Sequence, residues 1–273
     1  MKKRLIVLVP LVLAAGAAAY GSGKKDAQST ELVVFAAASM TETLQEIAIL
    51  YKAAAPDVNL IFNFDSSGTL KMQIQQGADC DLFISAGQLQ VDQLDIAANP
   101  SVNTEKLDFV LQGTRLNLLE NRVTLCVPQG NPASIKNFDD LAGKLKTADI
   151  LFAMGNSDVP VGQYTQRIFA YYGLDEKALA AAGKITYGSN VKEVATQILE
   201  ASVSCGVVYC TDAFSAGLQV VDYATVEMCG QVVYPASVLK TSRKAEVAKA
   251  FLAYLQTPAA MAVFEKVGFA AAH

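Results

Sequence analysis

The chain has 273 residues, of which 52% are hydrophobic and 18% charged, and its formal net charge is −4 at pH 7. This length and apolar content are enough to build one large core or two medium ones. No basic block follows the first few residues, which argues against nucleic-acid binding and against attraction of an anion by overall charge. Any bound anion must therefore be held by groups at the binding site itself.

The first 30 residues have the pattern of an export signal followed by a flexible linker. MKKR supplies positive charge, and LIVLVPLVLAAGAAA is an apolar stretch that ends in small residues. This stretch is short for a membrane span and contains Pro10, and an uncleaved anchor is the alternative. Ser22 stands where a lipoprotein would carry cysteine. We expect an unlipidated, exported protein in the periplasm or at the outer face of the cytoplasmic membrane.

Beyond the linker, strand-like runs alternate with helix-like segments. The expected strands are residues 32–38, 58–64, 81–86, 121–128, 149–155, 184–188, 206–210 and 232–239. The expected helices are residues 40–54, 70–76, 88–97, a short helix within 130–142, one ending at 172 before Gly173, and 191–202, 213–217, 245–256 and 258–267. This alternation predicts an α/β fold with mainly parallel sheets.

Five of the turns from strand to helix share a small, polar chemistry. The expected caps and first-turn residues are Ser39 with Glu42, Ser66 and Ser67 before Thr69, Asp158 with Pro160, Asn190 with Glu193, and Thr211 or Asp212. Each turn follows the C-terminal end of a strand, where open α/β sheets bind ligands. A helix N-terminus behaves as about half a positive charge, so four aimed at one point would approach about +2. A lone serine at a helix start is usually only a cap, whereas the set indicates a site for a small dianion.

The cysteines do not indicate a disulfide framework or a zinc site. They are Cys80, Cys126, Cys205, Cys210 and Cys229, and the one histidine is the terminal His273. An odd count leaves at least one thiol free unless chains pair. If the stretch between Cys205 and Cys210 is extended, these residues lie about 16 Å apart, which is beyond disulfide reach. We interpret the cysteines mainly as small core residues.

Five motifs together resemble the extracytoplasmic molybdate-binding proteins of ABC importers. They are FAAASMTETL (35–44), SSGTLKMQIQQGADCDLFISA (66–86), DVPVGQY (158–164), GSNVKEVATQI (188–198) and GVVYCTDA (206–213). The likeness runs from about residue 31 to 269 and includes PAAMAVFEKVGF, a tail that many solute-binding proteins share. The ordered combination of FAAAS, GADCDLFISA and GVVY followed by TDA is more specific.

The resemblance implies a fold and a division of the chain. The fold is an α/β, type II periplasmic-binding-protein architecture, with two α/β lobes joined by two crossing strands and a ligand cleft between them. Lobe I takes residues 31–121 plus 234–273, and lobe II takes residues 122–233. A protein of this class is a binding protein and not an enzyme, and we expect a monomer whose partner is the membrane permease of an ABC transporter.

The resemblance also implies the residues that hold a tetrahedral oxyanion through neutral donors. They are the hydroxyl and N–H groups of Ser39 and Ser67, the backbone N–H groups of Val161 and Val191, and the phenol of Tyr209. Taken alone, the valines would be core residues and the tyrosine a sheet-packing residue. No cofactor and no direct cation ligand is implied, since molybdenum enters as the oxyanion bound by these same residues.

Two positions depart from the family pattern. Residue 161 is usually alanine in the family and is valine here, which keeps the backbone donor but adds bulk. Asp65 stands where a small neutral residue is more common, and an inward carboxylate would repel a dianion. We expect Asp65 to point outward or to cap the helix.

The choice of ligand rests on protonation and size. Molybdate, tungstate and sulfate are unprotonated dianions near neutral pH, whereas hydrogen phosphate would leave its O–H unpaired in a donor-only site. We favour molybdate, with tungstate as a second ligand, and keep sulfate and phosphate as alternatives. Donor-bearing turns in both lobes predict that the lobes close on the oxyanion.

A serine hydrolase is the rival from another class. A Ser-His-Asp triad needs a histidine, and His273 lies on the tail. A serine–lysine arrangement would need Lys71 or Lys192 beside a serine. The export signal and the lack of a helix-turn-helix segment argue against a transcriptional regulator.

Overall fold

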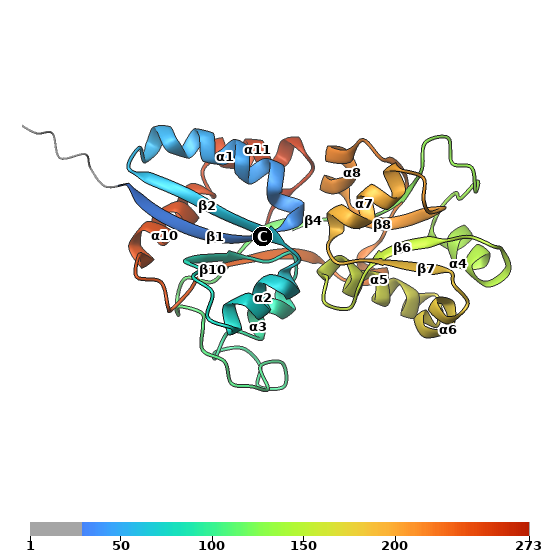
Figure 1. The fold of residues 1–273 in the computed structure, drawn as a ribbon, viewed down its shortest axis with the longest axis horizontal. Coiled ribbons are helices and arrows are strands. Elements are labelled where there is room, and N and C mark those ends of the chain that lie inside the picture. The colour runs from blue at the N-terminus through green and yellow to red at the C-terminus, as the bar shows by residue number, and fades with distance from the viewer. Residues whose placement is uncertain (1–28, 273) are drawn as a thin grey trace, which may run out of the picture.

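The computed structural model describes residues 29–272, which form two α/β lobes lying side by side (Figure 1). The predicted export signal and His273 lie outside the described residues. The first strand begins at Thr30, the last residue of the predicted linker. Lobe I is built on a six-stranded sheet and lobe II on a five-stranded sheet.

The sheet of lobe I has the strand order β11-β4-β10-β3-β1-β2. Its strands are β1 (Thr30–Ala37), β2 (Val58–Asp65), β3 (Leu82–Ile84), β4 (Leu116–Asn121), β10 (Val232–Val238) and β11 (Ala270–Ala271). Its helices are η1 (Ala38–Met40, a 3-10 turn), α1 (Thr41–Ala54), α2 (Ser67–Gln75), α3 (Gln88–Asp92), α10 (Ala245–Tyr254) and α11 (Pro258–Lys266). Helix α1 packs on β2 and α11, and α2 packs on β1.

The sheet of lobe II has the strand order β7-β6-β8-β5-β9. Its strands are β5 (Val123–Val127), β6 (Phe152–Gly155), β7 (Ile185–Gly188), β8 (Cys205–Tyr209) and β9 (Gln219–Tyr223). Its helices are α4 (Phe138–Thr147), α5 (Pro160–Tyr171), α6 (Glu176–Ala181), α7 (Val191–Leu199), α8 (Cys210–Ala216) and α9 (Val226–Cys229). Helix α5 packs on β6 and β8, and α7 packs on β6, β7 and β8.

The expectation of mainly parallel sheets is wrong. Strand β1 is parallel to β2 and β3, and β6 is parallel to β7 and β8, which makes four parallel pairings. The five antiparallel pairings all involve β4, β5 or β10. These strands lie next to the two segments in which the chain crosses from one lobe to the other. The chain therefore reaches them without the helical crossover that connects two parallel strands of one sheet.

Two connections join the lobes. Arg122 alone separates β4 from β5, and the second passage runs from β9 through α9 to β10. Strand β10 begins at Val232, just before the expected boundary at residue 234. The assignment of residues 31–121 and 234–273 to one lobe and 122–233 to the other stays a prediction, and we propose it as the division about which the molecule opens.

The core continues through both lobes. Helix α1 buries Leu44, Ile47 and Tyr51, spaced three and four residues apart as an amphipathic helix requires, together with Thr43. Between the lobes, the rings of Tyr209 and Tyr234 lie 5.8 Å apart, centroid to centroid.

Four of the five cysteines are buried and Cys210 is partly exposed, and all five, which lie within the described range, are free thiols. The interpretation as core residues is therefore confirmed for the four buried ones. Burial raises the pKa of Cys126 and of Cys229 to about 11, so both thiols are neutral at physiological pH.

The caps at two helix starts agree with the sequence. Ser66 caps α2, because its Oγ accepts a hydrogen bond from the Thr69 N–H at 3.1 Å. Asn190 caps α7, because its Oδ1 accepts from the Glu193 N–H at 3.1 Å. The Glu193 carboxylate reaches back to Ser189, one residue earlier than a standard capping box requires.

Three expected caps are wrong. Ser39 lies inside η1, and the N-cap of α1 is Met40. Asp158 precedes the N-cap of α5, which is Val159, although Pro160 does occupy the first turn as expected. Thr211 and Asp212 lie inside the first turn of α8, which starts directly after Tyr209. These helices start closer to their strands than the polar residues suggest, and η1, α1, α5 and α8 have no side-chain cap within the described chain.

No single helix among the described residues is long and apolar enough to cross a membrane. Helices α10 and α11 reach the required length and composition only as a pair bent by 63°.

Candidate functional site

The five candidate residues all lie at the junction of the two lobes. Ser39 is in η1 and Ser67 opens α2 in lobe I, whereas Val161, Val191 and Tyr209 lie in the first turn of α5, at the start of α7 and at the end of β8 in lobe II. Their exposed fractions are 5% for Ser39, 0% for Ser67, 0% for Val161, 4% for Val191 and 1% for Tyr209. A site built from them is therefore closed to water.

Hydrogen bonds bring three of these residues together. The phenol of Tyr209 donates to the carbonyl oxygen of Ala86 across the lobe junction at 3.4 Å, and the N–H of Ala86 donates to Ser67 Oγ at 2.9 Å. On the other side, the Tyr234 hydroxyl, whose ring packs on Tyr209, lies 2.9 Å from Ser39 Oγ. Tyr209 thus connects to Ser67 through Ala86 and to Ser39 through Tyr234.

The two valines enter the junction through their helix starts. The start of α5 abuts the turn after β3, where a Cβ placed on Gly87 would lie 3.3 Å from Pro160 Cβ. The start of α7 contacts η1, which carries Ser39. Because the first N–H groups of a helix have no partner within it, both helix starts present backbone donors toward lobe I. The Val161 side chain is fully buried and belongs to the hydrophobic core.

The lobes are in close contact around the site. A Cβ on Gly68 of α2 would lie 2.1 Å from the carbonyl oxygen of Asp158 in lobe II, so only glycine fits there. Nearby, Gln90 Nε2 donates to Gln163 Oε1 at 3.2 Å. The structure is therefore a closed form.

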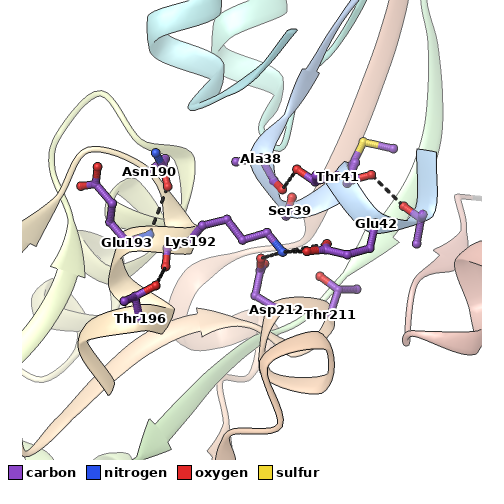
Figure 2. Close-up of polar contacts among 12 residues, drawn as sticks. Ala38, Ser39, Thr41, Glu42, Asn190, Lys192, Glu193, Thr196, Thr211 and Asp212 are labelled. Carbon is purple, nitrogen blue, oxygen red and sulfur yellow. Dashed lines mark hydrogen bonds and ion pairs between the residues drawn. The ribbon is translucent and has the colours of Figure 1, made fainter. Parts of the chain in front are cut away.

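A charged cluster beside the site was not foreseen from the sequence (Figure 2). The Lys192 ammonium reaches from α7 to Glu42 Oε2 on α1 of lobe I at 2.8 Å and to Asp212 Oδ1 on α8 at 3.4 Å. The Asp212 side chain is fully buried, and its oxygens make no hydrogen bond within the described residues. Its contact with Lys192 is therefore an ion pair without hydrogen-bond geometry. A lysine in the first turn of a helix lies at the positive end of the helix dipole, where its charge is unfavourable. The position of Lys192 was therefore a signal in the sequence that this residue has a special role.

Burial determines the protonation of two groups at the junction. It raises the pKa of the Asp212 carboxyl to about 6, an effect that the Lys192 charge opposes. It also raises the pKa of Tyr209 well above the ordinary value. The Tyr209 phenol therefore keeps its proton and remains a hydrogen-bond donor.

Asp65 is not the N-cap of α2, which is Ser66, so the expectation that Asp65 caps the helix is wrong. Its Oδ1 accepts a hydrogen bond from the Ser66 N–H at 2.7 Å. This bond occupies one carboxylate oxygen at the N-cap residue of α2.

The lysines considered for a serine–lysine hydrolase contact other groups. Lys71 Nζ donates to Gln93 Oε1 at 2.9 Å, and Lys192 pairs with two carboxylates. Within residues 29–272, no group of three or more His, Cys, Asp or Glu side chains is arranged to hold a metal ion. The junction is instead rich in hydroxyls and helix starts.

Two α/β lobes joined by two short connections, with buried donors from both lobes at their junction, define a two-lobed binding protein of the type II periplasmic fold. A family model described as bacterial extracellular solute-binding protein matches residues 32–270, and the chain belongs to this family. Membership places it among the bacterial extracellular solute-binding proteins.

Individual relatives extend this result. The chain is 33% identical to YvgL of Bacillus subtilis (strain 168), named an ABC transporter substrate-binding lipoprotein, over 98% of this chain and 96% of that protein. It is 30% identical to the molybdate-binding protein ModA of Haemophilus influenzae (strain ATCC 51907 / DSM 11121 / KW20 / Rd), over 99% of this chain and 100% of that protein. A solved substrate-binding domain, described as that of a molybdenum ABC transporter from Clostridium difficile, shares 29% identity and a TM-score of 0.63. The match covers 90% of this chain and 100% of that domain.

Proposed function

We propose that the protein captures molybdate, with tungstate as a second ligand, in the closed cleft between its lobes and delivers it to the membrane permease of an ABC transporter. The observation that carries the proposal is the gathering of Ser39, Ser67 and Tyr209 with the starts of α5 and α7 at one buried junction. The names of the relatives from Haemophilus influenzae and Clostridium difficile support the choice of ligand and of transporter.

The hydroxyl groups are set to donate. Ser67 Oγ already accepts from the Ala86 N–H, so its own proton is available to an oxyanion. The Tyr209 phenol donates to Ala86 only over 3.4 Å, a long bond that a charged acceptor would replace. The N–H groups of Val161 and Val191 add the partial positive charge of two helix starts.

The lysine of the charged cluster beside the site is already neutralised. Lys192 lies between the carboxylates of Glu42 and Asp212, so its charge is balanced inside the protein. An anion at the junction is then held by neutral donors and helix dipoles, which suits an unprotonated dianion. Hydrogen phosphate carries a proton of its own, and a donor-only site gives that proton no acceptor.

Delivery follows from closure. Contacts from both lobes seal the ligand from water, and the closed form presents a single surface to the permease. We propose that the protein acts as a monomer in the periplasm or at the outer face of the cytoplasmic membrane, as expected of the family to which it belongs.

Calorimetric titration of the purified protein with molybdate, tungstate, sulfate and phosphate tests the proposal. We expect tight binding of molybdate and tungstate and much weaker binding of sulfate and phosphate. The absence of heat with both metal oxyanions, together with tight binding of sulfate or phosphate, would overturn the assignment. Turnover of an ester substrate that is lost in Ser39→Ala would instead establish the hydrolase.

A further inference from the structure

We propose that Asn121 and Tyr234 are positioning residues that bias the direction of the Ser39 hydroxyl, so that Ser39 donates to the ligand and accepts less readily from anions that carry a proton. This inference rests on the proposed function, in which Ser39 contacts the oxyanion. The residues form a buried chain of hydrogen bonds from the connection between β4 and β5 to η1.

The first step is the orientation of the Asn121 amide. Its Oδ1 faces the backbone N–H of Arg122 at 2.8 Å and the thiol of Cys210 at 3.0 Å. A backbone N–H can only donate, so the amide oxygen must face it. The amide nitrogen of Asn121 consequently points the other way, toward the site.

The second step uses both protons of that nitrogen. Asn121 Nδ2 lies 3.0 Å from Thr211 Oγ1 and 3.1 Å from the Tyr234 hydroxyl. An amide nitrogen donates and does not accept. Tyr234 must therefore accept from Asn121 through its oxygen.

The third step follows from the single proton of Tyr234. Among residues 29–272, the remaining contact of its hydroxyl is Ser39 Oγ at 2.9 Å. Tyr234 is fully buried, so a proton pointing elsewhere would be left without a partner, which is costly. Burial also raises the pKa of Tyr234 well above the ordinary value, so the phenol keeps its proton. Tyr234 therefore donates to Ser39.

The fourth step concerns the ligand. Because Ser39 Oγ accepts from Tyr234, the proton of Ser39 is free to be donated to an oxyanion. Ser39 Oγ has two lone pairs and Tyr234 engages one of them, so fewer orientations remain in which Ser39 can accept a hydrogen bond from hydrogen phosphate. This hydrogen-bond chain thus biases the Ser39 hydroxyl toward donation into the cleft, and the amide that sets this bias lies beside the connection between the lobes.

The test compares the wild type with Tyr234→Phe and Asn121→Asp by calorimetry, using sodium molybdate and inorganic phosphate at pH 8. Tyr234→Phe releases the lone pair of Ser39, so the ratio of molybdate to phosphate affinity should fall about tenfold or more, on the scale of one hydrogen bond to charge. Asn121→Asp places an acceptor against Tyr234 and reverses the chain. It should weaken molybdate binding more than Tyr234→Phe does.

Tyr51→Phe is the matched control, because Tyr51 is a buried tyrosine packed on Phe251 away from the site. Circular dichroism checks that each variant is folded, and Tyr234→Phe alone decides the outcome if Asn121→Asp does not fold. An affinity ratio unchanged in Tyr234→Phe, or lowered equally in Tyr51→Phe, overturns the inference. A wild type that binds molybdate and loses it in Ser39→Ala keeps the proposed function even then, whereas a wild type that binds no molybdate refutes both.

Discussion

The ammonium of Lys192 on α7 lies 2.8 Å from the carboxylate of Glu42 on α1, so an ion pair spans the two lobes beside the candidate site (Figure 2). This contact exists only when the lobes are closed. Glu42→Gln should therefore weaken ligand binding while leaving the unliganded protein as stable as the wild type. The pair is partly exposed, so the expected loss is about 0.2–1 kcal/mol, and added salt should reduce the difference from the wild type.

Glu246→Gln is the matched control for this prediction. It removes the surface pair of Lys249 and Glu246 within α10, which joins no lobes. Titration calorimetry at low and high salt measures both variants. Equal affinities of Glu42→Gln and Glu246→Gln would show that the contact between the lobes contributes nothing to closure.

The buried Asp212 should make the stability of the protein depend on pH. Its pKa is raised by burial from 3.8 to about 6, so between these values the folded protein binds a proton that the unfolded chain releases. The favourable contribution is fully present below pH 3.8 and is lost as pH rises through about 6. On the order of 3 kcal/mol of unfolding free energy is involved.

Urea denaturation of Asp212→Asn across pH 4 to 7.5 tests this dependence. The free energy of unfolding of the variant relative to the wild type should rise with pH, since the variant lacks the titrating group. Asp57→Asn, at an exposed position, is the control. Parallel pH profiles for the wild type and Asp212→Asn would contradict the assignment of the titration to Asp212.

Gly68 should be essential for closure. A Cβ at this position would lie 2.1 Å from the Asp158 carbonyl oxygen in the other lobe, so Gly68→Ala should hold the lobes apart. Overpacking of about 1–3 kcal/mol corresponds to a loss of affinity of about 5- to 150-fold. Small-angle scattering should show an extended form even with saturating molybdate.

Gly143→Ala provides the comparison, because a Cβ at Gly143 of α4 meets nothing within 4 Å. Its thermal unfolding and its affinity should match or exceed those of the wild type. If Gly68→Ala closes on ligand with unchanged affinity, the close contact in the structure is not required for binding.

Ser67→Ala should weaken molybdate binding by about 1–3 kcal/mol, because the variant leaves an oxyanion acceptor and the Ala86 N–H without a partner. Ser215→Ala changes an exposed serine of α8 and should leave affinity unchanged. The measurement is the dissociation constant for molybdate. An affinity of Ser67→Ala equal to that of Ser215→Ala would remove Ser67 from the site.

Local chemistry explains which parts of the fold the sequence predicted. Long periodic segments such as α1 and α10, and apolar runs such as β1 and β8, were located within a few residues. Elements with a weak pattern were missed, among them β4, β9, α6 and α9. Helices α6 and α9 have only six and four residues, and β9 has no fully buried residue, so the sequence pattern that marks these elements is weak. Helix α3 ends at Asp92 instead of Ala97, where Asp95 accepts from the Ala97 N–H and stops the helix.

The candidate site was likewise predicted only where the signals are local in sequence. The positions of Ser67 and of the start of α7 follow from local capping signals. Ser39 followed three residues later by Glu42 was interpreted as a capping box, and this interpretation is wrong. The Ser39 hydroxyl instead forms a hydrogen bond with Tyr234, which is distant in sequence. The contacts of Lys192 with Glu42 and of Asn121 with Tyr234 span long stretches of chain, and no spacing rule reveals them.

The single residue between β4 and β5 restricts how the molecule can release its cargo. With Arg122 as the whole of one connection and α9 in the other, the lobes are tethered at two nearby points and are not free to tumble independently. We therefore expect their relative motion to be a bend about a single hinge line that passes through the two connections. After the ligand is released, the binding surfaces of the two lobes therefore still face each other. Binding of the next ligand then requires closure of the lobes but no reorientation of one lobe relative to the other.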